Sequence, residues 1–271
     1  MTSAVSNDPM LEPMQGFAAK LHPIGWVAVA LLVVAAAFHT VLETQYMIGH
    51  FSLWQWALLL AVVAVSAAHE ALNRIRLLIE SVSTGTRTIA WVLAWVVFVV
   101  QLFNVVARYS NEYVDRDILV GQMTSLAWQA FAAMFLLGAN YGIRDGINPR
   151  IDFWWADFSH KTKARLDFAL HVTLFLPFVW MAARILKSYA ATSLGQKRSG
   201  EWPSGWRVWN TWEQSPDADQ LPIGLIKAMM LVAFVLIGLQ IVGEVIKTGF
   251  VWLGRSDHGD IAEQIAPQRI E

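Results

Sequence analysis

Residues 222–246 read PIGLIKAMMLVAFVLIGLQIVGEVI, a run in which Lys227 and Glu244 are the only charged side chains. About 20 mostly apolar residues are enough to cross the roughly 30 Å hydrocarbon core of a bilayer. Unpaired backbone groups cannot lie in lipid, so a run of this length is predicted to be a helix rather than a strand. The segment therefore predicts a transmembrane helix.

Five further apolar runs of similar length precede it, at 24–41, 53–72, 89–107, 123–141 and 168–186. The chain is 56% apolar and only 15% charged, with a mean hydropathy of +0.43, as expected of a membrane protein. The predicted fold is therefore an all-α, polytopic membrane helical bundle of about six transmembrane helices.

The charge balance and the motif content exclude several function classes. Twenty Lys and Arg against 21 Asp and Glu give a net charge of −1, so the chain as a whole has no field to attract nucleic acid. It has no cysteine, so disulfides and thiolate metal sites are excluded. The sequence also lacks the phosphate-binding loop and the HExxH and GxSxG motifs. We therefore expect no catalytic residue, no metal site and no cofactor.

Positive residues are retained on the cytoplasmic side of a membrane, which orients the spans. With the N-terminus inside, twelve Lys and Arg fall on inner segments and seven on outer ones, and Lys227 is left within the last helix. Both termini are therefore predicted to be cytoplasmic.

Two groups of small residues allow close helix packing. Gly138 and Gly142 form a GxxxG pair, and four alanines recur at helical spacing in the second run, at Ala57, Ala61, Ala64 and Ala68. Assembly with a partner subunit and packing inside this same bundle are both open interpretations.

Polar side chains lie near the predicted helix ends. Asn104 and Arg108 are one turn apart in the outer half of the third run, and Lys227 is about one turn inside the outer end of the last. Gln240 and Glu244 share the same spacing near its inner end. Such groups either clamp helices together or extend to the membrane surface, and both interpretations stay open.

Two loops are rich in aromatic residues. The inner loop 143–167 combines them with Lys161, Lys163 and Arg165, which suits a segment lying on anionic lipid. The outer loop carries Trp202, Trp206 and Trp209, which a helix there would align into a stripe. This stripe would contact either lipid or an extracytoplasmic protein.

Two alternatives place chemistry inside the chain. His69 and His171 are predicted at similar depth, as a membrane haem protein would require. An independent carrier would need related halves with broken helices at the midplane. No such repeat is visible, and ionisable residues cluster at helix ends.

From about residue 96 to 247 the sequence resembles the small (DctQ-type) permease subunit of TRAP (tripartite ATP-independent periplasmic) transporters. Residues 104–109, NVVARY, are similar to the family's NVxxRY, and 131–152, FAAMFLLGANYGIRDGINPRID, to its stretch ending in HVRVD. Residues 226–228, IKA, are followed by Gln240 and Glu244, and this order is similar to the IKA and the later Gln and Glu of the family. The matching or subunit-contact positions are Asn104, Arg108, Gly138, Gly142, Arg150, Asp152, Lys227, Gln240 and Glu244. The family's His before Val-Arg is Asn148 here, so only Arg150 and Asp152 carry over from HVRVD.

The resemblance implies a non-catalytic subunit of the cell inner membrane that braces a large permease subunit. In that family uptake of organic acids or similar small solutes is a sodium-driven symport, and a periplasmic solute-binding protein delivers the solute. The implied partners are these two proteins and membrane lipid. Together with the apolar runs, the resemblance also divides the chain into four parts. These are a cytoplasmic tail (1–23), an extra transmembrane hairpin with its connecting loop (24–88), a four-helix domain (89–247) and a second cytoplasmic tail (248–271).

Overall fold

The computed structural model describes residues 14–40, 52–114, 121–147, 158–216 and 221–259. Apart from one isolated β-bridge between Gln214 and Pro222, the regular structure in these residues is helical. In chain order the helices are a 3₁₀ turn Phe17–Lys20, α1 Pro23–Thr40, α2 Leu53–Ala67, α3 His69–Ser110, α4 Gly121–Arg144, α6 His160–Leu170, a π-helical turn His171–Phe175, α7 Leu176–Ser193, α8 Val208–Thr211, α9 Gly224–Trp252 and α10 Ser256–Gly259. The all-α prediction is confirmed for this part of the chain.

Four helical segments are long and apolar enough to cross a membrane, namely His69–Ser110, Gln122–Arg144, His160–Ser193 and Gly224–Trp252. They coincide with the last four predicted spans and indicate a membrane protein. The first two predicted spans correspond to α1 and α2, which are apolar but shorter. The count of six spans and the cytoplasmic placement of both termini stay predictions.

The second apolar run ends earlier than predicted. α2 stops at Ala67, and Ala68 leaves the helical region with φ −94° and ψ 76° before α3 begins at His69. The following residues, 73–88, were predicted as a loop but belong to α3, which at 42 residues is about 63 Å long. Buried side chains recur there every three or four residues, at Leu72, Arg76, Ile79, Ser83, Thr86 and Ala90. A search for uniformly apolar runs misses this part of the helix, because polar residues interrupt it on both its buried and its exposed faces.

The chain divides into two compact units. Within the described residues, the first unit comprises 14–79, 158–173 and 242–259, and the second comprises 80–147 and 174–241. The division predicted from the resemblance, with boundaries at 23, 88 and 247, stays a prediction.

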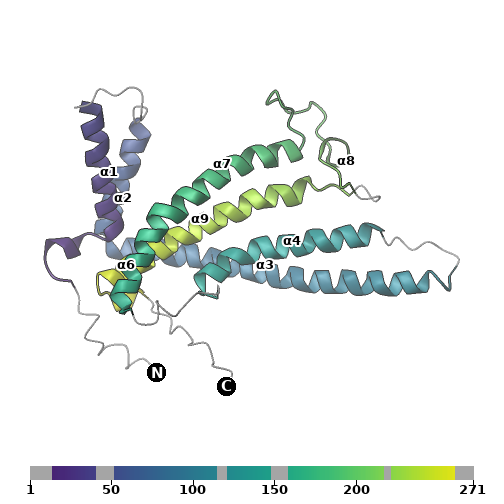
Figure 1. Cartoon of the computed structure of the whole chain (residues 1–271), viewed down its shortest axis with the longest axis horizontal. Helices are drawn as coiled ribbons and strands as arrows, with labels where there is room; N and C mark the ends of the chain where they lie inside the picture. Colours follow the sequence, from purple (N-terminus) through teal and green to yellow (C-terminus); the bar gives the residue numbers. More distant parts are fainter. Residues whose placement is uncertain (1–13, 41–51, 115–120, 148–157, 217–220, 260–271) are drawn as a thin grey trace, which may run out of the picture. The chain divides into compact units, whose positions relative to one another are not determined.

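In the first unit, α1 and α2 form a hairpin and lie side by side (Figure 1). Gly25 permits their close approach, since a Cβ atom added there would lie 2.0 Å from the Ser66 hydroxyl. The apolar core of this unit consists of Leu72, Ile246 and Phe250, with partly buried aliphatic side chains around them. A side chain at Gly25 would collide with Ser66 and force the two helices of the hairpin apart.

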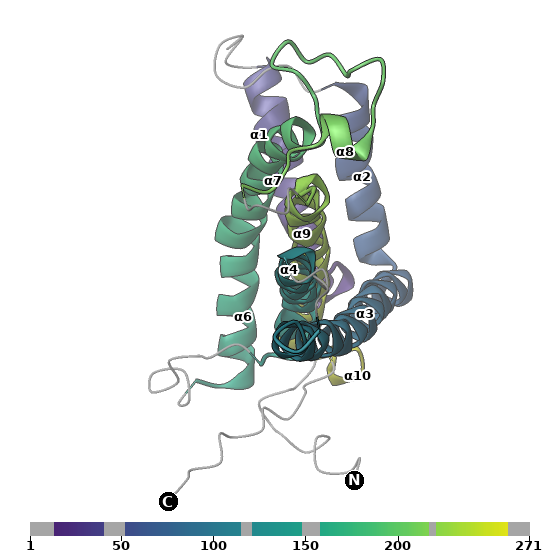
Figure 2. The same ribbon diagram turned by 90° about the vertical axis from the view of Figure 1, so that its right-hand side faces the viewer.

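In the second unit, α4 lies beside α3 and α7 beside α9, as both views show (Figure 1, Figure 2). A Cβ added at Gly238 of α9 would lie 2.9 Å from a methyl group of Val179 in α7, which is a tight approach. At Gly138 of α4 it would meet Ala90 of α3 at 3.9 Å, an ordinary contact. A core cluster formed by Ala133, Ile223 and Ile226 joins α4 to the start of α9.

The loop after α7, predicted to be an outer loop, folds back on its own helix ends. Within the predicted Trp stripe, only Val208–Thr211 is helical, so Trp202 and Trp206 are not on a helix. Trp206 instead donates its indole N–H to the carbonyl of Leu194 at 2.6 Å, and its ring lies 6.3 Å from that of Trp202. Trp202 and Trp206 thus form a compact cluster in the loop, and the predicted helical stripe is wrong for these two residues.

Candidate functional site

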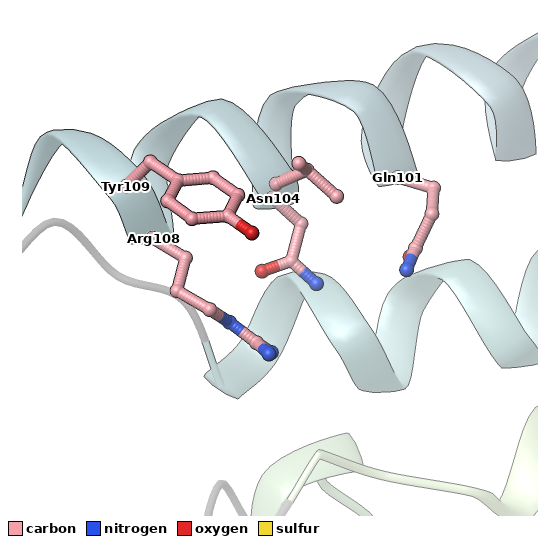
Figure 3. Close-up of a pocket in the computed structure, with 5 residues that line it drawn as sticks. Gln101, Asn104, Arg108 and Tyr109 are labelled. Atoms are coloured by element: carbon pink, nitrogen blue, oxygen red, sulfur yellow. The ribbon is translucent and has the colours of Figure 1, made fainter.

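A hollow of about 150 Å³ lies along the last turns of α3 (Figure 3). We call it the α3 pocket; it is lined by Gln101, Asn104, Val105, Arg108 and Tyr109. These residues are spaced three, four, seven and eight positions after Gln101, which places them on one helix face. The predicted pair Asn104 and Arg108 is therefore brought together, with Gln101 and Tyr109 added to it.

Asn104 is the buried member of the α3 pocket, with only 2% of its surface exposed. Its Nδ2 donates to the Thr124 hydroxyl of α4 at 2.8 Å. Its Oδ1 is buried and accepts no hydrogen bond in the described structure. Figure 3 shows the Asn104 amide between the side chains of Tyr109 and Gln101. The amide thus joins two helices and leaves one polar atom available.

Arg108 is exposed, and within the described residues its guanidinium forms no hydrogen bond, ion pair or ring contact. The lining of the α3 pocket supplies one cation, two amides and one phenol, without a carboxylate. All four polar groups can donate hydrogen bonds. Their chemistry suits a ligand that carries anionic or carbonyl oxygen atoms.

Lys227 forms an ion pair and a cation–π contact with residues of its own chain. Its Nζ lies 2.5 Å from Glu213 Oε1 and 5.0 Å from the centre of the Tyr189 ring. The Ser193 hydroxyl donates to the other oxygen of Glu213 at 2.7 Å, and the Glu213 N–H donates to the Ser193 carbonyl at 2.9 Å. We call Ser193, Glu213 and Lys227 the loop clamp, because they fasten the loop after α7 to α7 and α9.

The electrostatics of the loop clamp favour an ionised carboxylate. Hydrogen bonds from Lys227 and from Ser193 lower the pKa of Glu213 below its usual value. Sequence reasoning singled out Lys227 but missed Glu213 and Ser193. The acidic residue lies in an irregular loop, so no helical spacing linked it to the lysine.

Gln240 belongs to a buried network in the second unit. Ser83 donates its hydroxyl to Gln240 Oε1 at 2.6 Å, Asn140 donates to the Ser83 hydroxyl at 3.1 Å, and Thr86 donates to Asn140 Oδ1 at 3.0 Å. In the described structure none of these four side chains has a buried nitrogen or oxygen without a hydrogen bond. We call these four residues the closed network; it joins α3, α4 and α9.

Sequence reasoning found Gln240 but missed its three partners. Ser83 and Thr86 lie in the segment predicted as a loop, and Asn140 lies at the end of an apolar run. The three-residue spacing of Ser83 and Thr86, which places both on one helix face, is the sequence pattern that could have predicted their part in the network.

The remaining predicted positions are dispersed. Gly138 faces Ala90 and so packs inside the second unit, and Gly142 is half-buried in α4. Glu244 is half-buried in the first unit, where its carbonyl accepts from the Thr248 hydroxyl at 2.7 Å. Arg150 and Asp152 lie outside the described residues. The seven candidate positions that the structure describes therefore do not form a single site.

Three histidines of the first unit surround Phe250. The ring centres of His22, His69 and His258 lie 4.8, 5.7 and 5.1 Å from that of Phe250. Burial lowers the pKa of His22 to about 4, so this residue is neutral at pH 7. Phe250 occupies the centre of the cluster, and the described residues contain no group of three or more His, Asp or Glu arranged to hold a metal ion.

Comparison with known proteins gives no match: no family model, no curated protein and no solved structure is similar to this chain at a significant level. The class of protein therefore follows from the four long apolar helices, which indicate a helical membrane protein.

Proposed function

We propose that this chain is the small membrane subunit of a TRAP-type secondary transporter, bracing a large permease subunit in the inner membrane. In this role it catalyses no reaction and needs no cofactor. The large subunit and a periplasmic binding protein would provide solute specificity for the sodium-driven uptake of organic acids or similar solutes.

The closed network is the observation that supports this role most directly. A carrier presents polar groups and broken helices to its solute near the middle of the membrane. In the closed network the buried hydroxyl and amide groups bond to one another across α3, α4 and α9 instead. Networks whose members are satisfied rigidify the helices that carry them. A rigid bundle suits a fixed support for a moving neighbour.

The alanine face of α2 offers a surface for such a neighbour. All four alanines, Ala57, Ala61, Ala64 and Ala68, are exposed in the described structure. Small residues let a second helix approach closely, and close packing drives helix association where the hydrophobic effect does not act. Packing within the first unit leaves this face uncovered, which supports the partner interpretation.

Co-purification from native membranes tests the proposal. A tagged chain is expected to bring along a large permease subunit, identified by mass spectrometry. Replacing Ala61 and Ala64 by Leu is expected to reduce its recovery several-fold, because added bulk keeps a helix away. Replacing the exposed Val33 and Val34 of α1 by Leu is the matched control and should leave recovery unchanged.

Two further measurements separate this role from its alternatives. Liposomes that contain this chain alone should show no solute uptake, and sustained flux would support an independent carrier. A Soret band in the absorbance spectrum of the purified protein would support the haem protein built on His69 and His171.

A further inference from the structure

We propose that the α3 pocket binds a phospholipid, with Arg108 and Tyr109 on the phosphate and the two amides on the ester carbonyls beneath it. The site needs only that the chain spans a membrane, so it goes beyond the proposed transporter role and does not depend on it. The ligand class follows from the donors of the pocket, its depth and its apolar surroundings.

The donors match a phosphate at the helix end. Arg108 is two residues from Ser110, where α3 ends, and its guanidinium can donate two parallel hydrogen bonds to phosphate oxygens. Tyr109 is also exposed and adds a phenolic O–H. With no carboxylate in the lining, nothing in the pocket repels the negative charge.

The pocket extends deeper than a free phosphate would require. Gln101 lies seven residues before Arg108, which corresponds to about 10 Å along the helix axis. The headgroup region on each side of the hydrocarbon core is roughly 5 to 8 Å thick. Gln101 and Asn104 therefore reach the level at which a phospholipid carries its ester carbonyls, below its phosphate.

Asn104 provides the independent indication of a ligand. It is nine-tenths buried or more, it lines the pocket, and its Oδ1 has no partner in the described structure. The Asn104 Nδ2 group carries a second hydrogen besides the one that Thr124 accepts, so this amide, like that of Gln101, can donate to a lipid ester carbonyl.

The surroundings of the pocket suit acyl chains. Leu102, Phe103 and Val106 are about half exposed on the adjoining faces of the same helix turns. A polar strip flanked by exposed apolar side chains at a membrane helix end matches the two parts of a phospholipid. An acidic peptide would use the cation but not the deep amides or the apolar flanks.

Native mass spectrometry of the full chain in mild detergent, with added dioleoylphosphatidylglycerol, tests this site. The wild type is expected to retain one lipid that R108Q binds about tenfold more weakly, since a charge-assisted bidentate contact is lost. Q101L should weaken binding about two- to threefold through the lost amide. R184Q is the matched control, because Arg184 stacks on Trp180 at 4.7 Å, and it should bind like the wild type.

Three results would overturn the proposal. Equal lipid retention by the wild type and R108Q would remove the phosphate contact. Displacement of the lipid by millimolar inorganic phosphate would identify a free-anion site. Unchanged lipid retention by R108Q, combined with loss of the large subunit in co-purification, would assign Arg108 to a protein carboxylate. The lipid readout uses the isolated chain, so its failure is distinguishable from failure of the transporter role.

Discussion

The closed network and the α3 pocket both place polar side chains on α3, yet they satisfy them in opposite ways. In the closed network each side chain bonds to another within the second unit. In the α3 pocket Asn104 keeps an unpartnered oxygen and Arg108 is exposed. Polar groups that bond to one another stabilise a helix bundle, whereas polar groups that remain open prepare it for a ligand. The proposed support role of α3 rests on the first arrangement, and the proposed lipid site rests on the second.

The largest effect is expected where the closed network is broken. Asn140→Leu removes hydrogen bonds to Ser83 and to Thr86 and leaves both hydroxyls buried. We expect a loss of about 2 kcal/mol of unfolding free energy, near the upper end for polar contacts between membrane helices. Unfolding in mixed detergent micelles measures it.

A combined variant sharpens this test. Replacing Ser83 by Ala, Thr86 by Val and Gln240 by Leu together with Asn140→Leu removes all four side chains at once, so no hydrogen bond between them is left with only one partner. The combined variant is expected to regain much of the lost stability. A combined variant less stable than Asn140→Leu alone by about a further 2 kcal/mol would contradict this expectation. It would show that the hydrogen bonds of the closed network themselves add stability, beyond the cost of leaving a buried group without a partner.

The loop clamp should give a smaller, pH-dependent effect. The pKa of Glu213 is lower in the folded chain than in the unfolded chain, so its contribution to stability is present above about pH 4.5, the ordinary value for this carboxyl. That contribution is lost as the pH falls through the lower, folded pKa. Because the Glu213 side chain is 43% exposed, the effect should remain below about 1 kcal/mol at pH 7.

Proteolysis of the loop after α7 measures how firmly the loop clamp holds this loop. Glu213→Gln should speed tryptic cleavage near Lys197 and Arg198 at pH 7, compared with the wild type. Glu201→Gln is the matched control, since this carboxylate is exposed in the same loop. Equal cleavage rates for the wild type and Glu213→Gln would show that the clamp does not hold the loop.

The sequence predicted the long apolar helices well, because a bilayer requires uniform hydropathy over a known length. It placed Asn104 and Arg108 together correctly, since one helical turn determines their separation. It did not predict the pairing of Lys227 with Glu213 or of Gln240 with Ser83. Those contacts join residues 14 and 157 positions apart, so they depend on helix packing and loop conformation. The same limit applies to α3, whose polar first half is recognised by periodicity and not by hydropathy.

The smallest stability effect is expected at the α3 pocket. In lipid-free detergent Arg108→Gln should change the unfolding free energy by no more than about 0.5 kcal/mol, because this exposed side chain has no partner among the described residues to lose. After addition of phosphatidylglycerol the wild type should gain stability and Arg108→Gln should not, since only a ligand that binds the folded state shifts its unfolding. A large loss in the absence of lipid would mean that Arg108 is a structural contact, and the contrast between an open and a closed polar cluster on α3 would no longer hold.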